Sequence, residues 1–431
     1  MLFLILPHQL FDIKYLNKNN KYLIYEHPHY FKSYNYNKKK LMLHRASMKY
    51  YYDYLKKHKY NVIYKTYTQK LNSKTHYTLF DPIDHIKLPK KCKILETPNF
   101  LLTRKDYKKY HAKTDKFFFN NFYKFSKKLL NIIPNTKSKD KQNRKKMPQN
   151  TKIPKLPTLD NIDMKYIKEA KKYVEKNFPK NCGNIDNFNY PITHNSAKKW
   201  MRYFVKNKLK HFGDYQDFID KNNNYLFHSV LSTSINIGLL NPQDIIKYVL
   251  KNINKYKIKV NNYEGYIRQL FWREYQRYCY IYFDFSNKNY FGNKKKLSDK
   301  WYNGTLNIKP LDDAIKNAFN TGYLHHILRL MVIGNYMNLS GINPKEGFKW
   351  FMEFSCDSYE WVMYQNVYEM VFFISGGATM RKPYISSSNY ILKMSNYKKD
   401  KWCDEWDKLY HKFIKKNKRK MSKFKYYYKS I

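Results

Sequence analysis

The stretch "TGYLHHILRLMVIGN", residues 321–335, sets two adjacent histidines and an arginine among Leu, Ile, Met and Val. An α-helix over these residues would place His325 on one face with Arg329, and His326 on one face with Leu330. Both imidazoles would then lie beside apolar surface. Histidines in such positions are more often hydrogen-bonded core residues than functional groups, so this stretch alone leaves both interpretations open.

Two further apolar segments supply side chains that suit a binding pocket. The segment "SCDSYEW" contains Asp357, a carboxylate that could pair with Arg329 if that guanidinium is buried. The segment "YIRQLFWREY" places Trp272 next to Arg273. A large ring beside a charge on an apolar helix is typical of a wall that contacts a planar ligand.

Small hydroxyl side chains interrupt a fourth apolar segment, "HSVLSTSINIGLL", residues 228–240. Ser229, Ser232 and Asn236 lie near the expected start of a helix, where hydroxyls and backbone N–H groups suit phosphate oxygens. Serine at such a place is more often a helix cap. The segment therefore indicates a binding site only in combination with the other three.

The charge of the chain indicates a polyanionic partner. Its 431 residues carry 83 Lys and Arg against 33 Asp and Glu, a formal net charge of +50, which favours nucleic acid. An AT-rich genome would also enrich Lys, Asn, Tyr and Ile, but the field of the lysines is the same under either origin. The five cysteines form no C-x-x-C pair, and no run approaches the roughly 18 apolar residues of a membrane span. We expect a soluble, intracellular protein that enters no membrane.

The pattern of apolar residues changes once along the chain. Residues 1–130 alternate short apolar runs ("LFLIL", "YLIY", "NVIY", "CKIL") with helical segments, which predicts a Rossmann-like α/β domain with a parallel sheet. Residues 131–159 are rich in charge and Pro and lack periodicity, so they form a linker. Residues 160–431 carry long amphipathic patterns and predict a larger all-α domain.

In their order and spacing these segments resemble the flavin domain of the cryptochrome and photolyase superfamily, with the prokaryotic (6-4) branch as the most similar group. The matching phrases include "TGYLHHILRLMVIGNYMNLSGI", "DSYEWVMYQNVYEM" and, in the first half, "LETPNFLLTRKDY". The resemblance implies an α/β antenna domain, a helical domain that binds FAD, and a monomeric DNA photolyase. Its implied activity is light-driven repair of a (6-4) pyrimidine photoproduct flipped out of UV-damaged DNA.

The resemblance also assigns roles to individual residues. His326 matches the family's catalytic histidine and, as a protonated imidazole, would donate a proton to the lesion. His325, Tyr384 and Tyr390 would border the lesion beside it. The residues expected to bind FAD or line its cavity are Ser229, Ser232, Asn236, Gln269, Trp272, Arg273, Arg329, Asn335, Asp357, Tyr359 and Asn366.

The expected electron relay departs from the family pattern. Trp350 matches a relay tryptophan, but its neighbour, usually tyrosine, is Phe351, and another relay tryptophan is Tyr302. Phenylalanine does not readily give up an electron. We therefore expect slow photoreduction, or photoreduction rerouted through Trp361 or another tyrosine.

The metal cluster and the antenna site depart from the pattern as well. Of the four cysteines that hold the family's four-iron cluster only Cys403 remains, because the other matching positions include Pro310, Lys398 and Lys401. One thiolate cannot hold a cluster, so we expect no iron–sulfur cluster and no other metal. "LPHQL" replaces the Gly-Asp that usually precedes Gln-Leu, while Glu26 is retained, which leaves a lumazine-type antenna open.

Three alternatives to (6-4) repair stand at this point. The first is a cryptochrome-like photoreceptor that binds FAD and DNA without repair, which the altered relay favours. The second is a photolyase for cyclobutane dimers. The third is a nucleic-acid-binding protein without flavin, which a colourless purified protein would indicate.

Overall fold

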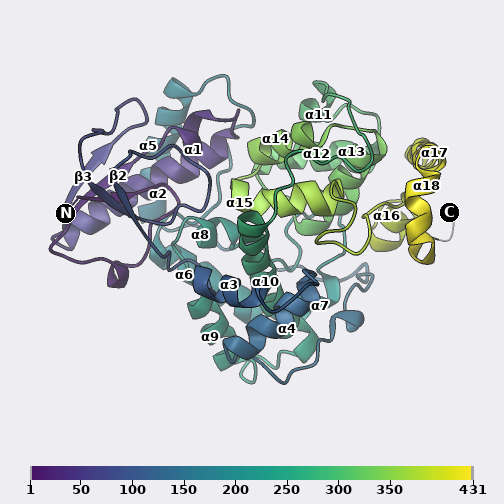
Figure 1. Ribbon diagram of the computed structural model, residues 1–431, viewed down its shortest axis with the longest axis horizontal. Coiled ribbons are helices and arrows are strands. Elements are labelled where there is room, and N and C mark those ends of the chain that lie inside the picture. The colour runs from purple at the N-terminus through teal and green to yellow at the C-terminus, as the bar shows by residue number, and fades with distance from the viewer. Residues whose placement is uncertain (1, 429–431) are drawn as a thin grey trace.

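The computed structural model describes residues 2–428 and begins with the expected parallel sheet (Figure 1). Five strands lie in the order β3-β2-β1-β4-β5, all parallel. Leu4 of β1 pairs with Leu23 of β2, and both are buried in a small cluster with Leu79 of β4 and loop residues such as Ile86 and Leu88. The α/β prediction is confirmed, although it lacked the fourth strand. The strands are β1 (Leu2–Ile5), β2 (Lys21–Tyr25), β3 (Asn61–Lys65), β4 (Tyr77–Phe80) and β5 (Cys92–Leu95).

Helices from the two sides of the boundaries expected at residues 130 and 160 pack against each other. Helix α2 (Lys38–Lys57) of the α/β part packs against α5 (Asn161–Asn177), which follows the linker. Helix α4 (Phe119–Leu129) precedes the linker but packs along α10 (Val260–Tyr282) of the helical part, next to α3 (Arg104–His111) (Figure 1). The two parts are therefore joined by more than the linker.

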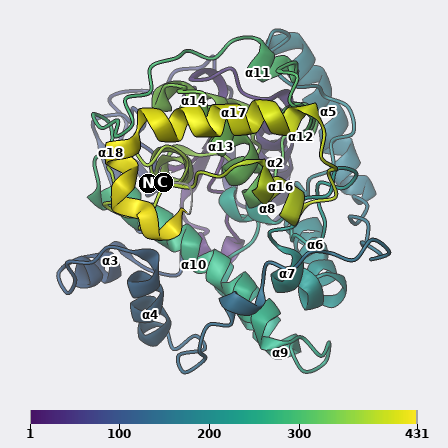
Figure 2. The ribbon, with the colours of Figure 1, turned by 90° about the vertical axis from the view of Figure 1, so that its right-hand side faces the viewer.

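The second part of the chain is helical, as predicted, and residues 160–428 contain only isolated bridges of extended backbone. Figure 2 shows α17 running across one face of the molecule, with α18 at its end. The remaining α-helices are α1 (His29–Lys32), α6 (His194–Asn207), α7 (Leu209–Tyr215), α8 (Ser232–Asn236), α9 (Pro242–Asn252), α11 (Lys300–Asn303), α12 (Lys309–Thr321), α13 (Asn335–Leu339), α14 (Pro344–Phe354), α15 (Glu360–Met363), α16 (Ser388–Met394), α17 (Lys401–Lys416) and α18 (Lys418–Met421). The π-helices are η3 (Leu328–Gly334) and η4 (Tyr364–Val371), and the 3-10 helices are η1 (Ile13–Tyr15), η2 (Asp140–Gln142) and η5 (Ser422–Tyr427).

The stretch 321–335 differs from the single α-helix expected for it. Helix α12 ends at Thr321, because Gly322 adopts a left-handed conformation with φ 68° and a side chain there would meet Cys356. The helix restarts at His326 and continues as the π-helix η3. His325 therefore precedes the helix and does not share a helical face with Arg329.

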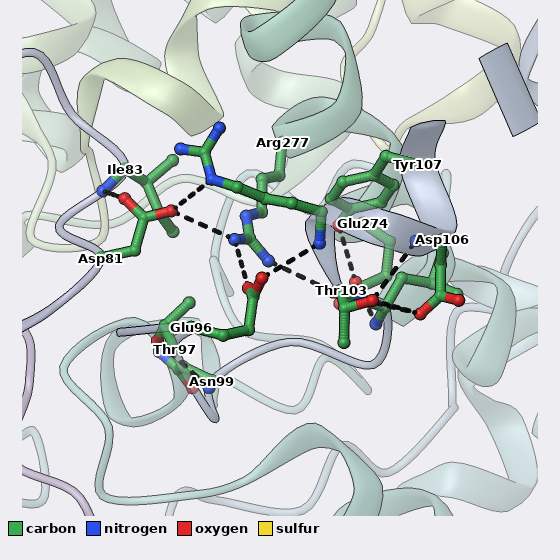
Figure 3. Close-up of polar contacts among 12 residues, drawn as sticks. Asp81, Ile83, Glu96, Thr97, Asn99, Thr103, Asp106, Tyr107, Glu274 and Arg277 are labelled. Carbon is green, nitrogen blue, oxygen red and sulfur yellow. Dashed lines mark hydrogen bonds and ion pairs between the residues drawn. The ribbon is translucent and has the colours of Figure 1, made fainter. Parts of the chain in front are cut away.

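Helix α10 is fastened to the α/β part by a buried arginine (Figure 3). The guanidinium of Arg277 donates to Asp81 at 3.3 Å, beyond the end of β4, and to Glu96 at 2.7 Å, beyond the end of β5. Arg104 of α3 donates to the same Asp81 carboxylate at 2.8 Å. One turn earlier, Glu274 accepts a hydrogen bond from the hydroxyl of Tyr107 at 3.0 Å. These contacts fix the position of the helix that carries several site residues.

Candidate functional site

Two adjoining cavities open between α8, α10 and the two π-helices. The inner cavity has a volume of about 270 Å³ and the outer cavity about 710 Å³. Helical segments wound as π-helices are rare and concentrate at functional sites. The residues that line both cavities are Phe212, His228, Gln269, Trp272, Gln276, His326, Leu330, Asn366 and Met370.

Polar side chains from the segment 228–240 line the inner cavity. Ser229, Ser232 and Asn236 all line it. The amide of Asn236 donates to the backbone oxygen of Asp357 at 2.9 Å and accepts from the Nε of Arg273 at 3.0 Å. This amide therefore joins α8 to α10 and to the loop before α15.

An ion pair between Arg329 and Asp357 forms one wall of the inner cavity. The two guanidinium nitrogens lie 3.0 and 3.2 Å from the two carboxylate oxygens, and the Nε of Arg329 donates to the backbone oxygen of Leu324 at 2.7 Å. Burial favours the neutral carboxyl, but Arg329 and the hydroxyls of Ser232 and Ser355 lower the pKa of Asp357 below its ordinary value. The charged pair predicted from the sequence is confirmed.

Helix α10 contributes an aromatic and cationic wall. Trp272 stacks on Phe119 of α4, with ring centroids 3.7 Å apart and planes 9° from parallel. The guanidinium of Arg273 is buried, lies 4.1 Å from the ring centre of Phe100, and donates to the backbone oxygen of Asn99 at 2.7 Å. Burial lowers the pKa of Arg273 to about 10, so it still carries its charge near pH 7.

The two adjacent histidines occupy different environments. His325 is buried and stacks on His228 at 4.8 Å, and burial holds its pKa well below the ordinary value. The imidazole of His326 is exposed, and it faces the two cavities. Removal from bulk water, together with the positive charges of Arg329, Arg144 and Arg268, lowers the pKa of His326 to about 4. The protonated imidazole expected from the sequence is therefore neutral near pH 7 in the protein without a ligand.

The outer cavity gathers His326, Tyr384 and Tyr390, the residues that the resemblance placed beside a lesion. The linker contributes a cation to the same cavity, because Arg144 lines it. Arg144 donates to Asp140 at 2.7 Å and to Asp217 at 2.9 Å, so the linker is held against the helical part.

Two residues expected to contact the cofactor lie elsewhere. Asn335 is absent from both cavity linings in the described part of the chain, and its amide bonds Ser386 of the outer cavity at 2.9 Å. Tyr359 is buried and shares a hydrogen bond of 2.9 Å with His44 of α2. Asn335 therefore holds a loop of the site, whereas Tyr359 holds the α/β part in place. In the described part of the chain neither side chain lines the inner cavity, and their expected contact with FAD stays a prediction.

The expected relay residues differ in how they connect to the inner cavity. Tyr302 lies 5.5 Å from Phe319, Phe319 lies 5.6 Å from Trp350, and Trp350 lies 5.3 Å from Phe351, all between ring centres. Phe351 lines the inner cavity, so this row of rings ends there. Trp361 lies outside the row, 4.9 Å from the guanidinium of Arg273.

Neither a metal site nor an open antenna site is evident at the positions considered. Among residues 2–428 no group of three or more His, Cys, Asp or Glu could hold a metal ion, and Cys403 is buried on α17. Glu26 is fully buried. Its carboxylate accepts hydrogen bonds from Arg45 at 2.8 Å, Tyr64 at 2.6 Å and Tyr173 at 2.7 Å. These hydrogen bonds hold the Glu26 carboxylate between β3, α2 and α5.

The residues of the inner cavity fit FAD. The donor set of serine hydroxyls, amides and guanidiniums suits a diphosphate and a ribityl chain, and the apolar side chains of η4 suit a planar ring. Within residues 2–428, Nη2 of Arg273, Nε2 of His228 and both ring nitrogens of His325 are buried without a hydrogen-bond partner. Unpaired polar atoms at a cavity wall are what a polar ligand would satisfy.

Sequence reasoning missed several residues of the site. The missed residues are His228, Arg144 and Arg268, which line the cavities, and Phe119, which stacks on Trp272. His228 begins the segment 228–240, of which the sequence analysis considered only the serines and Asn236. Phe119 comes from the part of the chain assigned to the α/β domain, so only its packing on Trp272 reveals it. The run of positive charge "NRKK" was the one available signal for Arg144.

Comparisons with known proteins agree with this architecture. The model of the deoxyribodipyrimidine photo-lyase-related protein family matches residues 3–87 and 77–190. A (6-4) photolyase of Agrobacterium fabrum is 34% identical over 295 residues, which is 65% of this chain and 58% of that protein. One uncharacterized protein of Acanthamoeba polyphaga mimivirus is 59% identical over 88 residues, which is 20% of this chain and 72% of that protein. A second uncharacterized protein of the same virus is 48% identical over 111 residues, which is 25% of this chain and 85% of that protein.

A solved structure shares the fold. The bacterial class III photolyase from Agrobacterium tumefaciens superposes with a TM-score of 0.57 at 12% identity, covering 91% of this chain and 86% of that one. The fold of this chain is therefore photolyase-like, with an α/β part, a helical part and a cavity in the helical part. Residues 3–190 match the photolyase-related family model. Within residues 2–428 no helix is long and apolar enough to cross a membrane.

Proposed function

We propose that this protein is a flavin-dependent DNA photolyase that repairs the (6-4) pyrimidine photoproduct in UV-damaged DNA. The observation that carries the proposal is the position of His326 between the inner cavity, which fits FAD, and the outer cavity, which Tyr384 and Tyr390 line. The 34% identity to a (6-4) photolyase supports the choice of lesion.

The residues that would hold FAD are those of the inner cavity. Ser229, Ser232 and Asn236 would meet its polar chain, and Arg329 with Asp357 would flank its ring system. When bound and reduced, FAD supplies one-electron donation driven by blue light. In the row of rings from Tyr302 to Phe351, Tyr302 and Trp350 would pass electrons toward this cavity, whereas Phe319 and Phe351 would slow the transfer.

His326 would donate a proton to the lesion, and the binding of DNA would prepare it to do so. Its imidazole is neutral near pH 7 partly because Arg329, Arg144 and Arg268 surround it with positive charge. DNA phosphates in the outer cavity would neutralise that charge and raise the pKa of His326. The proton would then sit on a ring nitrogen only while damaged DNA is bound. This order limits proton transfer to the productive complex.

The outer cavity would receive the flipped lesion. Its volume of about 710 Å³ is in the range of cavities that hold small molecules, and Trp272, Tyr384 and Tyr390 offer rings against which bases can stack. Arg144, Arg268 and the net charge of +50 would bind phosphates. Each phosphate neutralised should add about 0.9 to the slope of log affinity against log salt.

The experiment that tests the proposal is blue-light repair of an oligonucleotide that carries one (6-4) photoproduct. Wild type, His326→Ala and a matched control, His76→Ala, are compared after flavin reduction, each with a dark sample. His76 is exposed on the α/β part and lines neither cavity. We expect light-dependent repair by wild type and His76→Ala, and a loss of about 100-fold or more in His326→Ala.

Other outcomes would favour the alternatives. Repair of a cyclobutane dimer but not of the (6-4) product would reassign the substrate. Binding of damaged DNA by yellow protein with no turnover would favour a cryptochrome-like photoreceptor, for which the altered relay at Phe351 is the supporting observation. A colourless protein that binds no added FAD would refute the flavin assignment.

A further inference from the structure

The C-terminal segment Ser422–Tyr428 forms part of the rim of the outer cavity. Tyr427 and Tyr428 line this cavity together with Lys382 and Tyr384, which are remote from them in the sequence. The segment follows α18 at the end of α17, on the face that Figure 2 presents. The tail "KKNKRKMSKFKYYYKSI" is basic and aromatic, a composition that fits either a solvated end or an additional contact to DNA phosphates.

Three contacts fasten the segment to the body of the protein. Phe424 is buried and packs edge-on against Phe373, with ring centres 5.4 Å apart. The hydroxyl of Tyr428 donates to the backbone oxygen of Pro383. The ammonium of Lys382 lies 4.8 Å from the ring centre of Tyr427. The segment is therefore a fixed wall of the cavity and not a free tail.

Two neighbouring rings of the segment are exposed. Tyr426 is 92% exposed and Tyr427 is 45% exposed, and their rings stand 86° apart. They are among the few large hydrophobic side chains on the described surface, so core packing does not explain them. The residues 418–428 include the cations Lys418, Arg419, Lys420, Lys423 and Lys425, and no acidic residue.

Exposed rings interleaved with cations are the features by which proteins bind unpaired nucleic acid. Bases stack on aromatic faces whatever their identity, and lysines neutralise the phosphates between them. A duplex that has flipped its lesion into the outer cavity is left with unpaired bases opposite the lesion. The rim of that cavity is where such bases would be found.

We propose that Ser422–Tyr428 is a stacking platform that holds the bases left unpaired when a damaged nucleotide leaves the duplex. Tyr426 and Tyr427 would stack on these bases, and Lys423 and Lys425 would bind the adjoining phosphates. The inference rests on the proposed function, because it takes damaged DNA as the ligand of the outer cavity. Its effect is on the affinity for the opened duplex, whereas the step at His326 is left unchanged.

The test compares wild type with the double variant Tyr426→Ala/Tyr427→Ala. The matched control is Tyr426→Phe/Tyr427→Phe, which keeps both rings and removes only the hydroxyls. The probe is a duplex with one (6-4) photoproduct and the fluorescent base 2-aminopurine opposite the lesion. Dissociation constants, 2-aminopurine fluorescence and the repair rate of the saturated complex are measured for each protein.

We expect the alanine variant to bind between about fivefold and about 150-fold more weakly for each base that loses its stacking partner. Its bound 2-aminopurine should remain bright, whereas wild type and the phenylalanine variant should quench it. Lys423→Ala/Lys425→Ala should lower the salt slope by about one to two, because two phosphate contacts are lost.

Unchanged affinity and quenching in the alanine variant would overturn the platform. Tighter binding by that variant would overturn it as well, and would show that the segment obstructs the cavity. If wild type does not bind the lesion, the proposed function fails, and the same comparison is made on an undamaged duplex with a two-base bubble. Weaker binding of the bubble by the alanine variant alone would still support the platform, and equal binding by all three proteins would refute it.

Discussion

Replacing Asp357 with asparagine should destabilise the folded protein by leaving the positive charge of Arg329 uncompensated. The two side chains are 15% and 11% exposed and form two hydrogen bonds of 3.0 and 3.2 Å. Loss of one partner from a fully buried pair costs about 3–5 kcal/mol. Because these two groups keep some contact with the cavity and asparagine can still accept one hydrogen bond, we expect a loss of about 2–3 kcal/mol.

The expected loss converts to a small but measurable shift in the melting temperature. A chain of 431 residues has an unfolding entropy of about 0.9 kcal/mol per kelvin, so the Asp357→Asn variant should melt about 2–3 °C below wild type. The control is Asp186→Asn. Its partner Lys171 lies at the similar distance of 3.1 Å, but both side chains are largely exposed, and exposed pairs contribute less than about 1 kcal/mol.

The pH dependence of this difference provides a second check. The pKa of Asp357 is lowered in the folded chain, so its stabilising charge is fully present above the ordinary carboxyl pKa and is lost as the pH falls through the folded value. Scanning calorimetry at pH 7 and at pH 3 should show a smaller difference between variant and wild type at the lower pH. Equal shifts for Asp357→Asn and Asp186→Asn at pH 7 would refute the stabilising role of the buried pair. So would a difference that grows toward pH 3.

Three further predictions concern titration and stacking. Because the pKa of His326 is lowered to about 4 in the protein without DNA, kcat/KM for repair by wild type should rise as the pH falls from 8 to 6, and a flat profile of kcat/KM would argue against proton donation. Burial lowers the pKa of His8 to about 3, so between pH 6.5 and 3 the unfolded chain binds one proton more than the folded chain. The free energy of unfolding should therefore fall on acidification by up to about 1.4 kcal/mol per pH unit. His8→Gln should remove that part of the pH dependence of stability in melting curves. Trp272→Ala should weaken binding of lesion DNA about tenfold, whereas Trp272→Phe, which keeps a ring on Phe119, should weaken it less in a fluorescence titration.

Much of the fold follows from local patterns in the sequence. Strands such as "LFLIL" and "YLIY" are continuous apolar runs because both faces of a parallel sheet are buried. The fourth strand, "YTLF", is short and follows polar residues, so its apolar character was too brief to stand out. The helical part was predictable because amphipathic periodicity extends over whole helices.

Site residues were predictable where burying a charged side chain without a partner would cost free energy. They were not predictable where the local backbone geometry decides the direction of a side chain. A guanidinium in an apolar segment requires a carboxylate, which identified the pair of Arg329 and Asp357. Asn335 directly follows the π-helix η3. A π-helical turn uses more residues than an α-helical turn, so the spacing rules of an α-helix do not give the direction of a side chain beyond it. The lowered pKa of His326 depends on arginines from three separate segments, which no local pattern reveals.

The exchange of helices between the two parts determines how the chain can be divided. A fragment that ended at residue 130 would keep α4 without α10, on which it packs, and would lose α5 from α2. Each fragment would present an apolar helix face to water, which favours aggregation over independent folding. Chimaeras made with related proteins should therefore exchange α2 with α5, and α4 with α10, as pairs. In this architecture, helices that are distant in the sequence but pack on each other have to be kept together.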